Sequence, residues 1–191
     1  MSKREVRKEV LQTRKGLAAE DVRRLSRKVH ENLLSLSEFG TAKVIASYVA
    51  KRDEVQTDEI LRQALESGKK VIVPRSDLSS VRLRFHEIRS LAELLPGAFG
   101  IPEPPTGSPT VPLADADVVL VPMVAWDLEG HRVGYGKGYF DRELKSRGDA
   151  LGVGLAFEFQ RRDSLPATPT DVPMDAVVTD GRVVRFGRNS C

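Results

Sequence analysis

The chain has almost none of the residues that build disulfide frameworks or thiolate metal sites. One of its 191 residues is a cysteine, Cys191, at the last position. A lone thiol excludes an internal disulfide and a multi-cysteine zinc site, and it is typical of a protein in a reducing compartment. The three histidines lie far apart and show no metal-ligand spacing. The sequence therefore predicts a fold that is held together by its core.

Long apolar runs and an excess of one charge are missing as well. No run approaches membrane-spanning length, and the N-terminus has no apolar signal core. The net charge is only +3, with 30 basic and 27 acidic residues interleaved. This pattern does not demand a nucleic-acid partner, and an anionic small molecule fits it as well. We expect a soluble cytoplasmic protein with neither a membrane nor a nucleic acid among its partners.

The order of predicted elements indicates an α/β fold. An apolar fraction of 40% and the chain length suit one domain, residues 1–191, with a real core. Periodicity and capping signals predict helices at 3–17, 19–36 and 58–67. Short apolar or alternating runs predict strands at 44–49, 71–73 (closed by Pro74), 82–87, 118–122 and 151–156, and a hairpin at 175–186. Residues 44–73 thus form a βαβ unit, and 99–112 form an irregular loop.

Three alternating glycines, Gly134, Gly136 and Gly138, follow the apolar run at 118–126. Glycine has no Cβ, so other atoms can approach this backbone closely. A helix-like segment comes next, and backbone N–H groups at such a junction bind anions, with Lys137 adding a positive charge beside them.

The spacing of these glycines leaves two interpretations open. The stretch is not a Walker loop, because it has no Gly-Lys-Ser/Thr, and its third glycine comes one residue early for the dinucleotide fingerprint. It is either a phosphate-binding loop or a tight strand-to-helix turn with Tyr135 and Tyr139 packed on the core.

On the first predicted helix, cations share the apolar arc. At 3.6 residues per turn, one arc holds Val6, Val10, Leu11, Lys3, Arg7 and Arg14. The opposite face holds Arg4, Glu5, Lys8, Gln12 and Lys15. The cations of the first group either lay their stems on the core and keep their heads in water, or point at an anion.

Glu54 lies just past the C-terminal end of the strand predicted at 44–49. Open α/β sheets place their ligands at this edge. A glutamate in a loop is usually only solvated, and its position makes Glu54 a modest candidate for a ligand contact.

Residues 134–141, preceded by residues 121–127, closely resemble the signature of the 5-formyltetrahydrofolate cyclo-ligase family, also called methenyltetrahydrofolate synthetases. Four further features match in order. They are the basic N-terminal helix with residues 3–7 and Arg14, the acidic loop 53–57, the Gly-Ile-x-Glu-Pro segment within 99–104, and the closing acidic segment with Asp171, Asp175 and residues 178–179. The resemblance covers nearly the whole chain.

The resemblance implies both a fold and a reaction. The fold is a three-layer α/β sandwich with a mixed, mostly parallel sheet, preceded by two N-terminal helices. The reaction is the ATP-dependent ring closure of 5-formyltetrahydrofolate to 5,10-methenyltetrahydrofolate, which yields ADP and phosphate and uses Mg²⁺. The implied partners are these two small molecules, and we expect a monomer.

The resemblance also implies roles for individual residues. ATP would be held by Lys3, Arg4, Glu5, Val6, Arg7, Arg132, Val133, Gly134, Tyr135, Gly136, Lys137, Gly138, Tyr139 and Phe140. The folate would contact Val49, Glu54, Tyr135, Gly136, Lys137, Gly138 and Tyr139. Catalytic roles fall to Lys137 and Arg132, and Mg²⁺ would be held by Asp141 and Asp171. Phosphoryl transfer needs charge neutralisation and alignment more than a nucleophilic side chain, which suits these residue types.

Two positions depart from the family pattern. Phe140 stands where many members have a second tyrosine, so one hydroxyl contact is missing. Thr170 precedes Asp171 where a histidine or asparagine is frequent. Neither change removes a charge needed for ATP, and we expect activity to survive both.

Three other functions remain open at this stage. The same architecture hosts sugar-phosphate isomerases and acyl-CoA transferases, and fold does not determine function. A non-catalytic folate- or nucleotide-binding regulator is a second alternative, although it would not need to keep magnesium ligands. A basic nucleic-acid binder is a third, and it would bind with a steep salt dependence.

Overall fold

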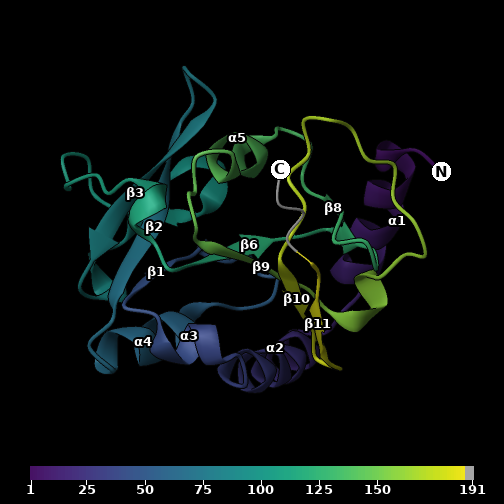
Figure 1. Cartoon of the computed structure of the whole chain (residues 1–191), viewed down its shortest axis with the longest axis horizontal. Helices are drawn as coiled ribbons and strands as arrows, with labels where there is room; N and C mark the ends of the chain where they lie inside the picture. The colour runs from purple at the N-terminus through teal and green to yellow at the C-terminus, as the bar shows by residue number, and fades with distance from the viewer. Residues whose placement is uncertain (188–191) are drawn as a thin grey trace.

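The computed structural model describes residues 1–187 and is built around a seven-stranded sheet (Figure 1). The strand order is β11-β10-β9-β6-β1-β2-β3. The strands are β1 (Val44–Ala46), β2 (Lys70–Asp77), β3 (Arg82–Ile88), β6 (Val118–Pro122), β9 (Leu151–Leu155), β10 (Ala176–Val178) and β11 (Val183–Arg185). The five inner strands pair in parallel, while β3 and β11 at the edges are antiparallel. The predicted mixed, mostly parallel sheet is confirmed.

Helices cover both faces of the sheet, which confirms the three-layer sandwich. In Figure 1, α2 (Ala19–Leu34), α3 (Ser37–Thr41) and α4 (Asp58–Glu66) lie on one side and α5 (Tyr139–Leu144) on the other. Strand β6 shows why this must be so. Val118 and Leu120 belong to the core beneath α2, while Val119 and Val121 belong to the core beneath α5. Because both faces of such a strand are apolar, each needs a covering layer.

The first helix, α1 (Lys3–Lys15), lies outside these layers. It begins at a capping box, in which the Ser2 hydroxyl accepts from the Glu5 N–H and the Glu5 carboxylate accepts from the Ser2 N–H. Val6 and Val10 pack against the small hairpin of β7 (Ala125–Trp126) and β8 (Arg132–Val133). Figure 1 shows α1 beside β8, at one end of the sheet. The polar residues of α1 that share this arc are thereby directed toward the chain that follows β8.

Some predicted boundaries were wrong. Strand β2 continues through Pro74 to Asp77, because β1 pairs with it only as far as Ile72. Pro74 therefore lies where β2 has one neighbour, and there a missing N–H is tolerated. The helix predicted at 19–36 is interrupted, since α2 ends at Leu34 and α3 starts at Ser37.

Residues 91–115, which include the stretch predicted as an irregular loop (99–112), contain several short elements. Strands β4 (Leu95–Pro96) and β5 (Pro102–Glu103) pair antiparallel. Single 3₁₀ turns occur at Leu91–Glu93, Ala98–Gly100 and Leu113–Asp115, and another follows β9 at Glu158–Gln160. None of the helices within residues 1–187 is long and apolar enough to cross a membrane. Cys191 lies outside the described residues.

Candidate active site

A cavity of about 730 Å³ opens at the carboxyl edge of the sheet. Its walls include residues that follow β1 or end β2 and β6, namely Tyr48, Val49, Pro74, Ser76 and Pro122. This is the edge at which open α/β sheets bind ligands, and the volume is within the roughly 300–1,000 Å³ typical of ligand pockets. Glu54 lines the same cavity, as its position after the first strand predicted, and it is buried.

The glycine loop, residues 134–138, forms one wall of the cavity. Gly138 precedes α5 in the left-handed conformation (φ 67°), and Gly136 has φ 97°. A Cβ on Gly136 would lie 3.2 Å from the guanidinium carbon of Arg7. Glycine is needed here for its backbone conformation and for the close approach of a cation. The loop therefore combines a tight turn with a wall of the cavity.

The two aromatic residues of this loop region behave differently. Tyr139 is partly buried against the core beneath α5, as the turn interpretation expected, although it also lines the cavity. Tyr135 is more exposed, with 39% of its surface accessible. Phe140 lines the cavity and packs against both cores, and Thr170 also lines the cavity.

Two cations of the inner arc of α1 reach the cavity. The Nε of Arg7 donates to the Gly134 carbonyl at 2.7 Å, and Lys3 forms an ion pair with Asp171. The other N-terminal residues expected at ATP lie elsewhere. Arg4 is exposed, Glu5 serves in the helix cap, and Val6 is in the core, so none of these three lines the cavity.

The buried Arg132 pairs with the partly exposed Asp141 in the lining of the cavity. Arg132 donates to the Asp141 carboxylate and to the Val172 carbonyl, and the Val172 N–H donates to Asp141 at 3.3 Å. Burial lowers the pKa of Arg132, while the Asp141 carboxylate opposes this change. A guanidinium titrates far above neutral pH, so Arg132 remains a cation held in a defined orientation.

Lys137 and Phe99 both line the cavity and are in contact with each other. The Lys137 ammonium is 4.2 Å from the centre of the Phe99 ring, within cation–π range. The same ring packs edge-on against Tyr139, with centroids 6.4 Å apart. We did not predict Phe99 as a site residue, because an aromatic in a proline-rich stretch gives no signal of what it will face.

Asp141 and Asp171 line one cavity and have the hard carboxylate oxygens that Mg²⁺ prefers. Burial would raise the pKa of Asp171, but hydrogen bonds from Lys3 and Thr168 outweigh it and hold this pKa below its usual value. Within residues 1–187, Asp171 accepts all its hydrogen bonds at Oδ2, from Lys3 and Thr168. Asp141 accepts all of its own at Oδ1, from Arg132 and the Val172 N–H. The second oxygen of each carboxylate is therefore available, and the donor set fits a magnesium ion bound with phosphates.

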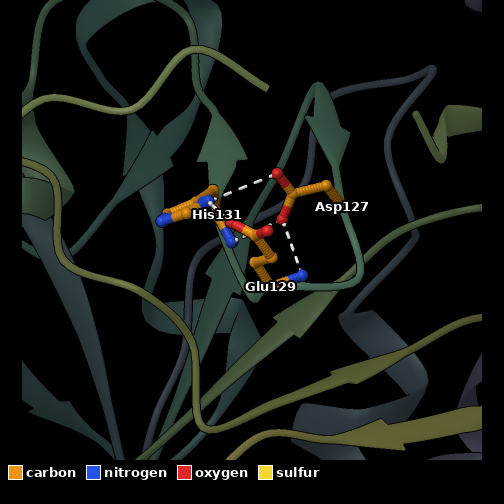
Figure 2. Close-up of side chains that lie close together, drawn as sticks. All are labelled: Asp127, Glu129 and His131. Carbon is orange, nitrogen blue, oxygen red and sulfur yellow. Dashed lines mark hydrogen bonds and ion pairs between the residues drawn. The ribbon is translucent and has the colours of Figure 1, made fainter. Parts of the chain in front are cut away.

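A second polar cluster lies in the turn between β7 and β8 (Figure 2). Asp127, Glu129 and His131 place one potential metal-ligand atom each within 4.8 Å of one another. The sequence spacing of the histidines had not indicated such a group. Oδ1 of the buried Asp127 accepts the N–H groups of Glu129 at 3.0 Å and His131 at 2.9 Å, and Oδ2 accepts that of Leu165 at 3.0 Å. This carboxylate stabilises the turn and lies outside the cavity lining.

Comparisons with known sequences all match the same protein family. A sequence profile described as the 5-formyltetrahydrofolate cyclo-ligase family matches residues 1–180. A probable 5-formyltetrahydrofolate cyclo-ligase of Caenorhabditis elegans is 31% identical, with 96% of this chain and 97% of that protein covered. The 5-formyltetrahydrofolate cyclo-ligase of Escherichia coli K12 is 29% identical over 91% of this chain and 98% of its own.

Two solved structures agree in fold. The 5,10-methenyltetrahydrofolate synthetase of Aquifex aeolicus, solved by NMR, superposes with a TM-score of 0.86 at 41% identity, covering 100% of this chain and 95% of that one. The 5,10-methenyltetrahydrofolate synthetase of Mycoplasma pneumoniae gives a TM-score of 0.76 at 26% identity, covering 94% and 99%.

Proposed function

Because this chain belongs to the 5-formyltetrahydrofolate cyclo-ligase family, we propose that it converts 5-formyltetrahydrofolate to 5,10-methenyltetrahydrofolate, with ATP as phosphoryl donor and Mg²⁺ as cofactor. One observation carries the proposal. A single cavity brings together the glycine loop, four cations and three carboxylates from distant parts of the chain, namely Lys3, Arg7, Arg132, Lys137, Glu54, Asp141 and Asp171. The same cavity would also suit a non-catalytic binder of folate and nucleotide, and turnover separates that alternative from the enzyme.

ATP would bind along the glycine loop, with its phosphates beside the cations. Arg7 already contacts the loop backbone, so its guanidinium can donate to a phosphate oxygen without a large movement. Lys137 would leave the Phe99 ring for the transferring phosphoryl group, because an anion attracts the ammonium more strongly than an aromatic face. Arg132, held by Asp141 and the Val172 carbonyl, would neutralise charge on the phosphates.

The folate would lie toward Val49 and Glu54. A pterin ring has an edge of N–H donors, and the buried Glu54 carboxylate is an acceptor suited to it. This arrangement would present the formyl oxygen toward the glycine loop, where the phosphates lie.

The reaction follows from activating a poor leaving group. The formyl oxygen attacks the γ-phosphorus, the bond to the bridging oxygen breaks, and ADP leaves. N10 then attacks the activated formyl carbon, its proton is lost, and the C–O bond breaks to release inorganic phosphate. The protein's task is alignment and neutralisation of charge, which Arg7, Arg132 and Lys137 can perform. Asp141 and Asp171 would hold the Mg²⁺, which supplies further charge neutralisation on the phosphates.

The test is to mix purified protein with 5-formyltetrahydrofolate and Mg-ATP and to follow methenyl absorbance. We expect product only with ATP and Mg²⁺ together, and one ADP per methenyl group. Omission of ATP and chelation of Mg²⁺ are the matched controls. Product without ATP, or binding of both substrates without turnover, would contradict the proposal, and the second outcome would identify a non-catalytic binder.

A further inference from the structure

Arg14 is a buried cation directly behind the wall of the cavity. Only 1% of its surface is exposed, and it is not among the residues that line the cavity. A buried charge is costly unless it is paired and hydrogen-bonded, so its partners indicate what it is for. The proposed reaction does not use this residue.

The guanidinium of Arg14 joins three segments of the chain. It projects from α1, its Nε donates to the Asp53 carbonyl at 3.0 Å, and its Nη2 lies 3.0 Å from the Asp53 carboxylate. The same Nη2 donates to the Tyr135 hydroxyl at 2.8 Å. Asp53 precedes Glu54, an expected folate contact, and Tyr135 lies in the glycine loop, which is expected to hold ATP and also to contact the folate.

Tyr135 is the residue whose side-chain contacts restrict the conformation of the glycine loop. It stands between Gly134 and Gly136, two residues with high backbone freedom, so without side-chain contacts the loop would sample many conformations. Its ring has Lys51 on it at 5.0 Å, and its hydroxyl is held by Arg14. Burial and the nearby Glu54 carboxylate raise the pKa of Tyr135 above its usual value, so the hydroxyl keeps its proton.

We propose that Arg14 is a positioning residue, which acts through the Tyr135 hydroxyl to hold the glycine loop against the loop of Asp53 and Glu54, and so couples ATP binding to folate binding. A ligand that orders one loop then orders the other, and the effect must be reciprocal. The inference rests on the proposed function, because it takes the two loops as the two substrate subsites.

The test measures this coupling directly. The Kd of a non-hydrolysable ATP analogue is determined by calorimetry with and without saturating 5-formyltetrahydrofolate, for the wild type, Arg14→Met, Tyr135→Phe and the double variant. Lys15→Met is the matched control, since Lys15 is the exposed neighbour of Arg14 and carries the same charge. Thermal melts accompany each protein. Tyr135→Phe removes only a hydroxyl from a partly exposed side chain, so it remains informative if Arg14→Met does not fold.

In the wild type we expect the folate to tighten binding of the analogue by about 5- to 10-fold, in the range of typical coupling between sites. Tyr135→Phe and Arg14→Met should each bring this ratio close to one. The double variant should be no worse than the more severe single one, because both changes break one contact. Lys15→Met should keep the wild-type ratio.

A wild-type ratio of one, or an unchanged ratio in Tyr135→Phe, would overturn the inference. Turnover of the wild type separates this from failure of the proposed function. Activity combined with an unchanged ratio rejects the role of Arg14 alone. Inactivity combined with a ratio that Tyr135→Phe abolishes keeps the coupling and rejects the reaction.

Discussion

Two polar clusters of this molecule look alike in composition and differ in what their atoms do. The turn cluster, Asp127, Glu129 and His131, has the residue types of a metal site. The carboxylates Asp141 and Asp171 stand further apart in sequence and next to cations. In the turn, backbone N–H groups occupy both oxygens of Asp127. Asp141 and Asp171 each accept their hydrogen bonds at one oxygen, and within residues 1–187 the second oxygen of each has no hydrogen-bond donor.

The difference teaches that residue type does not make a site. A carboxylate whose lone pairs are used by its own backbone stabilises a turn, and binding a metal there would break those bonds. A carboxylate at an open cavity can exchange its partners for a ligand. Substitutions in the turn should therefore change the stability of the fold, and those in the cavity should change ligand binding.

The largest expected effects come from replacing one glycine in the cavity and one glycine in the turn. Gly136→Val should weaken ATP binding by at least about 100-fold, because it strains a left-handed residue and displaces the Arg7 guanidinium. Gly130→Val, in the turn, should instead cost about 2–4 kcal/mol of stability, since its Cβ would lie 3.0 Å from the Met174 carbonyl. Calorimetry and thermal melts separate the two. Normal ATP affinity in Gly136→Val would reduce the glycine loop to a tight turn.

Arg7 and Arg4 allow a residue that lines the cavity to be compared with an exposed residue of the same helix. Arg7→Ala should weaken ATP binding by about 10- to 150-fold through loss of a charge-assisted contact. Arg4→Ala should change it by less than about twofold, because Arg4 is exposed. Both variants lose one positive charge, so long-range attraction cannot explain a difference. Equal KM values for ATP, or loss of activity by unfolding alone, would make α1 a packing element only.

The aspartates sharpen the comparison further. Asp141→Asn and Asp171→Asn should each raise the Mg²⁺ concentration needed for half-maximal activity by about tenfold, since each removes a hard anionic ligand. Asp127→Asn should leave that concentration unchanged and cost about 1–3 kcal/mol of stability, because its amide cannot accept all the backbone N–H bonds. A shifted magnesium titration in Asp127→Asn alone would reverse the assignment of the two clusters.

The smallest effect concerns acid stability. Burial disfavours the charged form of Asp171, but Lys3 and Thr168 outweigh it and lower its pKa. The resulting stability is present above about pH 4, the unfolded value, and is lost as the pH falls through the lower folded pKa. Lys3→Met should remove about 0.5–1 kcal/mol of this stability at pH 6 and less at pH 3. Arg4→Met should leave the pH profile unchanged, and identical profiles for both variants would show that the pair contributes nothing.

Local sequence signals predicted most of the fold. The periodicity of α1 placed Val6, Val10 and Arg14 on its inner arc, and all three are buried. The βαβ unit and the hairpin at the end of the sheet are confirmed. Pro74 was misjudged as a strand end because its effect depends on whether a neighbouring strand extends that far.

The candidate site could be predicted only in part. Glu54, the glycine loop, Lys3 and Arg7 line one cavity, while Arg4, Glu5 and Val6 do not. The family resemblance at the N-terminus spans the continuous stretch 3–7 of α1. Successive side chains of a helix are rotated by about 100°, so some residues of any such stretch face away from the cavity. The assignment of the others to ATP, folate and Mg²⁺ stays a prediction.

By itself, the sequence determined which face of α1 is inward and where most strands of the main sheet lie, because these depend on neighbours a few residues apart. Only the tertiary structure decided that Arg7 meets Gly134, that Lys3 meets Asp171, and that Arg14 holds Tyr135. It also decided that the lone pairs of Asp127 are already used. The pairings of Arg7, Lys3 and Arg14 join residues more than a hundred positions apart, and they depend on how the sheet and the β7–β8 hairpin bring those segments together. No local pattern encodes that.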